Sequence, residues 1–387
     1  MKKLLTLVSV LTCLTANSQP VHLSPDAEIS IITCGPWQGE VYSAFGHNAI
    51  RVYDSAYRLN DVYNYGVFDF NQPNFYLNYT RGLLLFKLGV YSYPDFRDFY
   101  TYYNRSVTEQ VLELTQTQKQ AVYNYLEWNA LPENESYRYD YFYNNCASQV
   151  RDVFVKVLKD SIQFDGTFVK TDYTIRQLTD IYLKKQPWGD LGIDICLGLP
   201  MDKKASPYEY MFLPDYIEYS FDHVTIRKDG AMVPIVKEKR QVYTSLPEKI
   251  STSLFHPWVV FGIFFAITLG LSLYDLRRKK LSKWFDMLLF GAVGLVGLLL
   301  LLLWTATDHA AAAKNFNLLW ALPTHLFVFV IYREKSSQFL KKYFLRVAVL
   351  MLVLLAGWFI MPQELNIFLL PFVGTLLCRA FVISRLL

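Results

Sequence analysis

The last third of the chain consists of long, nearly uncharged apolar runs, and these runs constrain its fold more than any other feature. A helix that spans a membrane needs roughly 20 mostly apolar residues. Five stretches approach that length: about Trp258–Leu276, Trp284–Thr305, Phe316–Tyr332, Tyr343–Met361 and Leu365–Leu387. The third is the weakest, because Pro323 and His325 interrupt it. The sequence therefore predicts an all-α domain of five transmembrane helices, in preference to buried helices of a soluble core.

The basic residues between these runs predict how the helices cross the membrane. The loops after the first and third runs are basic, with Arg277, Arg278, Lys279, Lys280 and Lys283 in one and Arg333, Lys335, Lys341 and Lys342 in the other. The other two loops contain a single basic residue, Lys314. Because cytoplasmic loops collect Lys and Arg, we expect both basic loops inside the cell, the region before the first helix outside and the C-terminus in the cytoplasm.

The N-terminus has the pattern of a secretory signal peptide. Lys2 and Lys3 precede an apolar stretch, Leu4–Leu14, that is too short to span a bilayer. Ala16-Asn17-Ser18 then offers small residues for cleavage. Lipidation at Cys13 is the alternative, but Leu11 and Thr12 stand where small residues are usual. We therefore expect a signal peptide over 1–18, an exported domain over 19–255 and a transmembrane domain over 256–387.

Composition and charge distribution exclude several classes of protein. The chain is 52% hydrophobic and 19% charged, which excludes disordered and collagen-like chains. The net charge is only +4, and the basic residues sit in short clusters between apolar runs. Because such clusters do not form a stripe that tracks phosphates, we expect no nucleic-acid partner.

The exported region predicts an α+β domain. Three segments combine β-branched and aromatic residues with turn residues at their ends, as strands do: Ile29–Thr33, His47–Asp54 and Asp61–Phe70. Helical spacing covers Thr115–Leu131 and Ala147–Lys159. Asp229-Gly230 is a strong hairpin turn between His223–Lys228 and Ala231–Lys237. The apolar, Pro-rich segment Leu197–Ile217 fits either a loop packed on this domain or one resting on the membrane or its helices.

Cys146 is the best candidate for a reactive thiol. The exported domain has three cysteines, Cys34, Cys146 and Cys196, so at least one remains unpaired, and whether Cys34 and Cys196 pair stays open. Asn144 or Asn145 is a good N-cap for the helix that follows, which places Cys146 in its first turn. There the helix dipole and free N–H groups favour a thiolate. The alternative is a buried structural cysteine.

A thiol nucleophile needs a base, and His47 is the best placed histidine. It opens a predicted strand and follows Gly46, which allows close approach by a substrate. Of the other histidines outside the membrane runs, His223 starts a hairpin and His256 adjoins the membrane. Asn64 on the next strand is a candidate to orient the imidazole, as an amide does in Cys-His-Asn enzymes. Ordinary strand residues are the alternative for both His47 and Asn64.

The order of these motifs resembles the circularly permuted papain-like fold, of the NlpC/P60 and lecithin-acyltransferase-like kind. More specifically, the chain resembles the Lnb-type bacterial lipoprotein N-acyltransferases over nearly its whole length. The resemblance rests on segments 45–52, 63–70, 139–146, 197–200 and 212–216 and on a run in the membrane half, 307–309 and 315–320.

The resemblance implies an acyltransferase of the bacterial inner membrane, with a periplasmic catalytic domain in which Cys146 is the nucleophile and His47 the base. It also implies a phospholipid as acyl donor and the α-amine of a diacylglyceryl-cysteine lipoprotein as acceptor. We expect no cofactor and no metal, since the sequence contains no zinc-site spacing. The rival interpretations are a cysteine amidase or peptidase acting on cell-wall peptide, and a membrane scaffold without activity.

Polar residues near the membrane are functional candidates by default. Four of them cluster where the second and third predicted helices meet the outer face: Asp308, His309, Asn315 and Asn317. With Asn145, they are the candidate substrate-binding residues, although a plain solvated loop explains the cluster equally well. His325 lies deeper, where a hydrogen-bonded structural histidine is expected.

Overall fold

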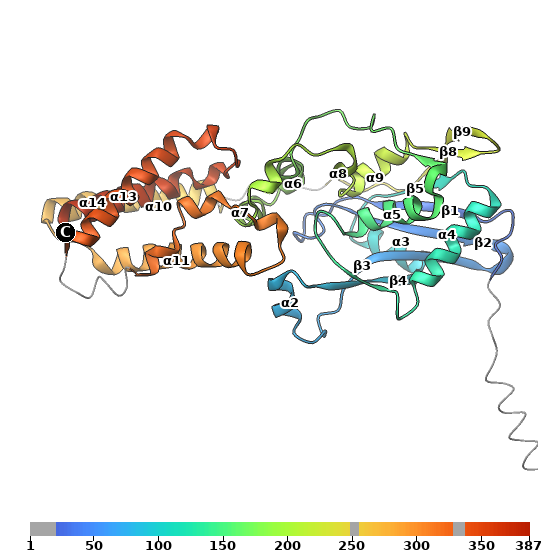
Figure 1. The fold of residues 1–387 in the computed structure, drawn as a ribbon, viewed down its shortest axis with the longest axis horizontal. Helices are drawn as coiled ribbons and strands as arrows, with labels where there is room; N and C mark the ends of the chain where they lie inside the picture. The colour runs from blue at the N-terminus through green and yellow to red at the C-terminus, as the bar shows by residue number, and fades with distance from the viewer. Residues whose placement is uncertain (1–20, 248–254, 328–336) are drawn as a thin grey trace, which may run out of the picture.

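A computed structural model describes residues 21–247, 255–327 and 337–387. The predicted signal peptide, 1–18, lies outside these residues. The molecule is elongated, with an α+β part at one end and a bundle of long helices at the other (Figure 1). The predicted α+β character of the first part and the helical character of the second are therefore confirmed.

A seven-stranded antiparallel sheet forms the centre of the α+β part, in the order β10-β5-β1-β2-β3-β4-β6. The strands are β1 (Glu28–Cys34), β2 (His47–Asp54), β3 (Leu59–Val67), β4 (Leu85–Ser92), β5 (Val107–Leu112), β6 (Ser136–Arg138) and β10 (Val236–Tyr243). A small second sheet contains β7 (Ile162–Gln163), β8 (Thr225–Lys228) and β9 (Ala231–Pro234). Asp229 and Gly230 both have positive φ between β8 and β9, as the predicted hairpin turn requires.

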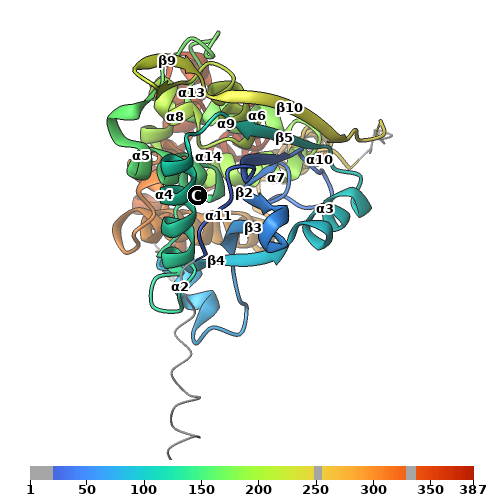
Figure 2. The ribbon, with the colours of Figure 1, turned by 90° about the vertical axis from the view of Figure 1, so that its right-hand side faces the viewer.

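Helices cover both faces of the large sheet, so its central strands β1, β2 and β5 are buried on both sides. Figure 2 shows α4 (Gln116–Asn129) and α5 (Cys146–Leu158) on one side of the strands and α3 (Tyr93–Tyr102) on the other. Ile29 and Ile31 of β1 point into the core beneath α5, whereas Ile32 and Cys34 pack with the rings of α3. This alternation follows from the two-residue repeat of a strand.

The remaining periplasmic helices are short and connect the sheet to the membrane half. They are α2 (Phe75–Arg81), α6 (Ile175–Leu183), α7 (Pro187–Cys196), α8 (Pro207–Tyr210) and α9 (Pro214–Phe221). The apolar side chains of the 197–217 segment, among them Met201, Phe212 and Leu213, are buried in the core of the periplasmic domain. Of the two interpretations of this segment, packing on the domain is therefore confirmed for its apolar side chains.

The membrane half contains α10 (Pro257–Arg278), α11 (Lys283–Thr305), α13 (Ser337–Ala356) and α14 (Leu370–Leu386). Three helical segments among the described residues are long and apolar enough to cross a membrane: Pro257–Arg278, Lys283–Thr305 and Ile367–Leu386. These confirm the first, second and fifth predicted spans as helices. The helix of the fourth begins earlier than predicted, at Ser337, and carries Lys341, Lys342 and Arg346 in its first half.

The third predicted span is not a continuous helix in its described part. Short 3-10 turns occupy Phe316–Leu319 and Pro323–Leu326, and 328–332 lie outside the described residues. Pro323 begins the second turn. Proline has no backbone N–H, so it cannot donate the hydrogen bond that a continuing helix needs. His325 is buried here, and its Nδ1 lies 2.7 Å from the hydroxyl oxygen of Tyr343 in α13, in agreement with its expected structural role.

A buried ionic network joins three of the long helices. Arg379 of α14 contacts Asp286 of α11 at 2.7 Å and Asp275 of α10 at 3.0 Å. The Arg379 guanidinium and the Asp286 carboxylate are fully buried. Removing one partner of such a pair leaves an uncompensated buried charge.

We therefore expect Arg379→Met to be strongly destabilising, by about 3–5 kcal/mol. Thermal unfolding of the full chain in detergent should show a clear fall in Tm. Lys342→Met is the matched control, since Lys342 is an exposed basic residue in the same half of the chain. Equal Tm values for the two variants would contradict a stabilising role for the network.

A second buried network joins the periplasmic domain to the membrane half. Arg176 of α6 is completely buried and donates to Asp194 and Asp202. Asp202 in turn accepts from the backbone N–H of Glu364, in the loop before α14. Gly198 donates from its backbone to Ala311 after α11. These bonds hold the periplasmic domain directly against the outer loops of the helices.

Candidate active site

Cys146 is the first residue of α5, as the capping pattern predicts. The Asn145 side chain accepts from the Ser148 N–H, and the Ser148 hydroxyl accepts from the Asn145 N–H, which closes a capping box. Val150, Val153 and Phe154, which follow Cys146 on the same face of the helix, anchor α5 in the core. The thiol therefore sits at the positive end of a rigidly anchored helix.

His47, the first residue of β2, lies beside Cys146, since a Cβ on Gly66 would stand within 4 Å of both side chains. On its other side, His47 Nε2 is 2.5 Å from Asn64 Oδ1 of β3. The imidazole also stacks on the Tyr100 ring of α3, with centroids 5.8 Å apart and planes 12° apart. The structure thus brings Cys146, His47 and Asn64 together in that order, and the stacking ring limits how the imidazole can turn.

The surroundings of Cys146 favour the thiolate. Burial by itself would raise the pKa of the thiol, but the charge and hydrogen-bonding capacity of His47, together with the backbone N–H groups of Asn48 and Ala147, outweigh it. The net effect is a Cys146 pKa below its ordinary value. A thiolate is the nucleophilic form of cysteine, so this site suits attack on a carbonyl carbon.

Two glycines with positive φ leave room around the pair. Gly46, at φ +89°, precedes His47, and Gly66, at φ +94°, lies beyond Asn64 on β3. A Cβ on Gly66 would stand 3.5 Å from Cys146 Cβ and 3.9 Å from His47 Cε1. Both glycines therefore adopt backbone conformations that other residues rarely adopt, and Gly66 keeps the space beside the thiol open.

Three tyrosines near Cys146 were not predicted as part of the site: Tyr137, Tyr139 and Tyr141. Burial, and then the nearby Cys146 thiolate, raises the pKa of both Tyr137 and Tyr139. The hydroxyl of Tyr141 is buried and has no hydrogen-bond partner among the described residues. The alternation of Tyr137, Tyr139 and Tyr141 is a two-residue repeat that could have indicated an extended segment with one aromatic face.

The candidate substrate-binding residues do not form one cluster. Asn145 is the buried helix cap, and its amide donates to the carbonyls of Tyr141 and Phe212. Asn315 and Asn317 are buried, and both donate to the Ile195 carbonyl at the end of α7. Asp308 forms an exposed ion pair with Arg138, and His309 Nε2 lies 3.1 Å from the Tyr79 carbonyl oxygen. Only Asp308 and His309 are therefore near the surface.

Cys34 and Cys196 are both free thiols in the structure. Cys34 lies on β1 directly opposite His47 of β2, and burial raises the pKa of its thiol. Cys196 ends α7, where burial also raises its pKa. The question left open by the sequence is answered: these two cysteines do not pair with each other.

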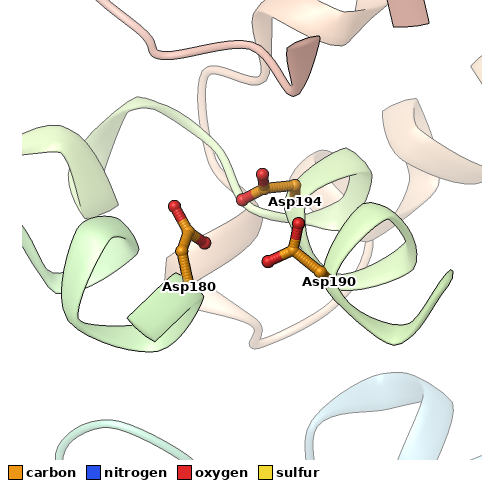
Figure 3. Close-up of side chains that lie close together, drawn as sticks. All are labelled: Asp180, Asp190 and Asp194. Carbon is orange, nitrogen blue, oxygen red and sulfur yellow. The ribbon is translucent and has the colours of Figure 1, made fainter. Parts of the chain in front are cut away.

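Three carboxylates meet at the junction of the two halves, as Figure 3 shows. One carboxylate oxygen from each of Asp180, Asp190 and Asp194 lies within 4.8 Å of the other two, beside a cavity of about 600 Å³. Burial and the neighbouring carboxylates raise the pKa of Asp180, and the pKa of Asp190 rises to about 6 for the same reasons. Asp194 is paired with Arg176 and bonded by the Asn366 amide, so the group is part of the junction network.

The fold and site define a membrane-anchored protein whose periplasmic α+β domain holds a cysteine–histidine–asparagine arrangement at a helix start. The chain belongs to the Lnb family: the model of the Lnb N-terminal periplasmic domain matches residues 23–180, and the model of the Lnb transmembrane domain matches residues 249–387. No curated protein and no solved structure shows a significant match. The chain is accordingly an inner-membrane protein of the lipoprotein N-acylation family, whose members are acyltransferases.

Proposed function

We propose that this protein moves an acyl chain from a phospholipid, through a thioester on Cys146, to the α-amine of a diacylglyceryl-cysteine lipoprotein. The family supports acyl transfer in general. The observation that carries the specific mechanism is the contact between His47 and Cys146 at the start of α5. This arrangement has the parts of an activated nucleophile: a thiol, a base within hydrogen-bond reach and a third group that orients the base.

In the first half-reaction, the Cys146 thiolate attacks the ester carbonyl of the donor. His47 gives a proton to the departing glycerol oxygen, so that lysophospholipid leaves and the acyl chain remains on sulfur as a thioester. Because Asn64 engages His47 Nε2, the other ring nitrogen, Nδ1, is the one available to exchange this proton. Asn64 acts as a positioning residue for the imidazole.

In the second half-reaction, the acceptor amine attacks the thioester carbonyl and His47 takes a proton from the amine. The carbon–sulfur bond breaks, the amide forms and the Cys146 thiolate is restored. Negative charge develops on the carbonyl oxygen in both steps. The backbone N–H groups of Asn48 and Ala147, which help to lower the pKa of the Cys146 thiol, are our candidates to stabilise that charge.

The domain arrangement that we propose is a signal peptide over 1–18, a periplasmic catalytic domain over 19–255 and a transmembrane domain of five helices over 256–387, with the C-terminus in the cytoplasm. The order of His47 before Cys146 along the chain supports a permuted papain-like catalytic domain. The basic loops support this orientation. The chemistry requires no metal or cofactor, because the thiolate and imidazole supply nucleophile and base.

We assign the polar candidates different roles from their contacts. The side-chain amides of Asn145, Asn315 and Asn317 donate to backbone carbonyls, so we assign these three residues a structural role. Asp308 and His309 sit beside α2 at the outer end of α11, where a lipid headgroup would pass. They remain our candidates for contact with substrate.

Mass spectrometry of a lipoprotein N-terminus tests this function. We expect the peptide to gain one amide-linked acyl chain when the full-length protein and phospholipid vesicles are both present. The diacylglyceryl peptide should stay unchanged when either is omitted. Release of a cell-wall peptide by the protein, with an unmodified lipoprotein, would instead support the amidase and overturn our proposal.

A further inference from the structure

An exposed apolar patch surrounds α2, next to the membrane half. We call it the α2 patch, and its residues are Phe70, Tyr76, Leu77, Tyr79 and Leu85. Tyr76 is 76% exposed and Leu77 is 55% exposed, although both are large apolar side chains. Contiguous patches of this kind on a soluble surface mark an interaction site.

The contacts of α2 place this patch at the membrane surface. The Asp308 N–H donates to the Arg81 carbonyl at the end of α2, over 3.0 Å. His309 reaches the Tyr79 carbonyl from the same segment. That segment directly follows α11, a candidate spanning helix, and Figure 1 shows α2 projecting from the sheet beside it. The patch is therefore level with the end of a membrane helix, where Tyr and Phe side chains are favoured.

A continuous series of aromatic rings leads from α2 towards Cys146. The series passes from Phe75 to Phe68, Phe86, Tyr139, Tyr141 and Phe45, with centroid separations of 6.5, 5.1, 4.1, 6.5 and 5.4 Å. Its last members lie at the site: Phe45 is two residues before His47, and both Tyr141 and Cys146 pack against the core cluster that contains Phe45. We call this series the aromatic track.

We propose that the α2 patch and the aromatic track bind an acyl chain of a membrane glycerolipid and guide its ester carbonyl to Cys146. This inference rests on the proposed function and names the element that admits the donor. An acyl chain suits the track because every step along it offers an apolar ring face or edge. It also suits the exposed patch, because a lipid chain can enter only from a surface that lies at the bilayer.

A double variant of the patch, Tyr76→Ser/Leu77→Ser, tests the proposal with two donors. One donor is a long-chain phospholipid in vesicles, and the other is a water-soluble butanoyl ester that needs no membrane. Intact-mass measurement follows the rate at which each acylates Cys146. We expect a fall of about tenfold or more with the vesicle donor, because apolar contact area is lost. The rate with the soluble ester should remain within about twofold of the wild-type rate, since the site is untouched.

The matched control is Tyr57→Ser/Trp128→Ser. Both side chains are exposed aromatic groups, one in the turn after β2 and the other in α4. This control should keep both rates. The proposal is overturned if the patch variant keeps its vesicle rate, if it loses both rates, or if the control loses the vesicle rate equally.

Two further outcomes separate this proposal from others. Normal adduct formation from vesicles with slow discharge by the acceptor peptide would assign the patch to the lipoprotein, and would overturn the donor role. Cys146→Ala in the same assay should accept neither acyl group. Acylation of that variant by both donors would refute the proposed function itself, whatever the patch variant does.

Discussion

Cys146→Ala should abolish acyl transfer while leaving the fold intact. The variant removes the sulfur that carries the thioester in the proposed mechanism, so we expect the rate of lipoprotein acylation to fall by about a thousandfold or more. Alanine is a good helix former, and the cap of α5 comes from Asn145 and Ser148, so the helix start should be unaffected. The measurement is the acylation rate of the purified full chain, with Tm as the folding control.

Cys196→Ala is a matched control, because Cys196 is also a partly buried thiol but lies at the end of α7. It should retain the wild-type rate. Normal acylation by Cys146→Ala, with a Tm equal to that of the wild type, would remove Cys146 from the mechanism.

His47→Ala should lower the rate of Cys146 acylation by about 10²–10⁴-fold, the range for loss of a general base. It should also change how Cys146 ionises. In the wild type, burial raises the pKa of the thiol, and His47 together with the backbone N–H groups of Asn48 and Ala147 more than offsets it. Without His47 the burial remains, so the pKa must rise. The pH at which iodoacetamide alkylates Cys146 at half its maximal rate should therefore move upward.

Intact-mass measurement of alkylation across a pH series provides this profile. His223→Ala is the control, since His223 is an exposed histidine of the same domain whose Nδ1 lies 2.9 Å from the Tyr219 carbonyl oxygen, away from Cys146. Its profile should match the wild type. An unchanged profile in His47→Ala would show that the helix start and backbone N–H groups alone set the thiol pKa.

Local sequence patterns predicted the parts of the site that depend on local physics. The start of α5 at Cys146 follows from a cap residue and a helical repeat of apolar residues, and both act within a few positions. The β8–β9 turn similarly follows from Asp229-Gly230. His47 could be placed at the start of a strand for the same reason. The fold class of each half followed from the composition and periodicity of long segments.

The sequence predicted less well what depends on contacts between distant segments. Whether Asn64 reaches His47 depends on the register of β2 against β3, which pairs Ile50 with Tyr63. Asn315 and Asn317 looked like substrate residues, but the end of α7 supplies the carbonyls that they bind. The Tyr139 ring, directly after β6, stacks on the Phe86 ring of β4, and no local repeat connects them.

The membrane half shows the same division. Uniformly apolar helices such as Lys283–Thr305 were recognised by length and hydropathy alone. Residues 316–326 have a similar apolar content, but Pro323 and the capping asparagine Asn315 break them into short turns. These turns pack on α11 and bind α7, so their conformation reflects tertiary contacts.

The central claim is that the acyl chain passes through a covalent bond to Cys146, and the donor-only reaction tests it most directly. The full-length protein is mixed with phospholipid vesicles, without acceptor, and its intact mass is measured after an acid quench. The account predicts one acyl adduct per chain, located on Cys146, together with an equal amount of lysophospholipid. Absence of any adduct under every quench, in a preparation that acylates lipoprotein when the acceptor is added, would contradict it and would require direct attack by the amine on the phospholipid ester.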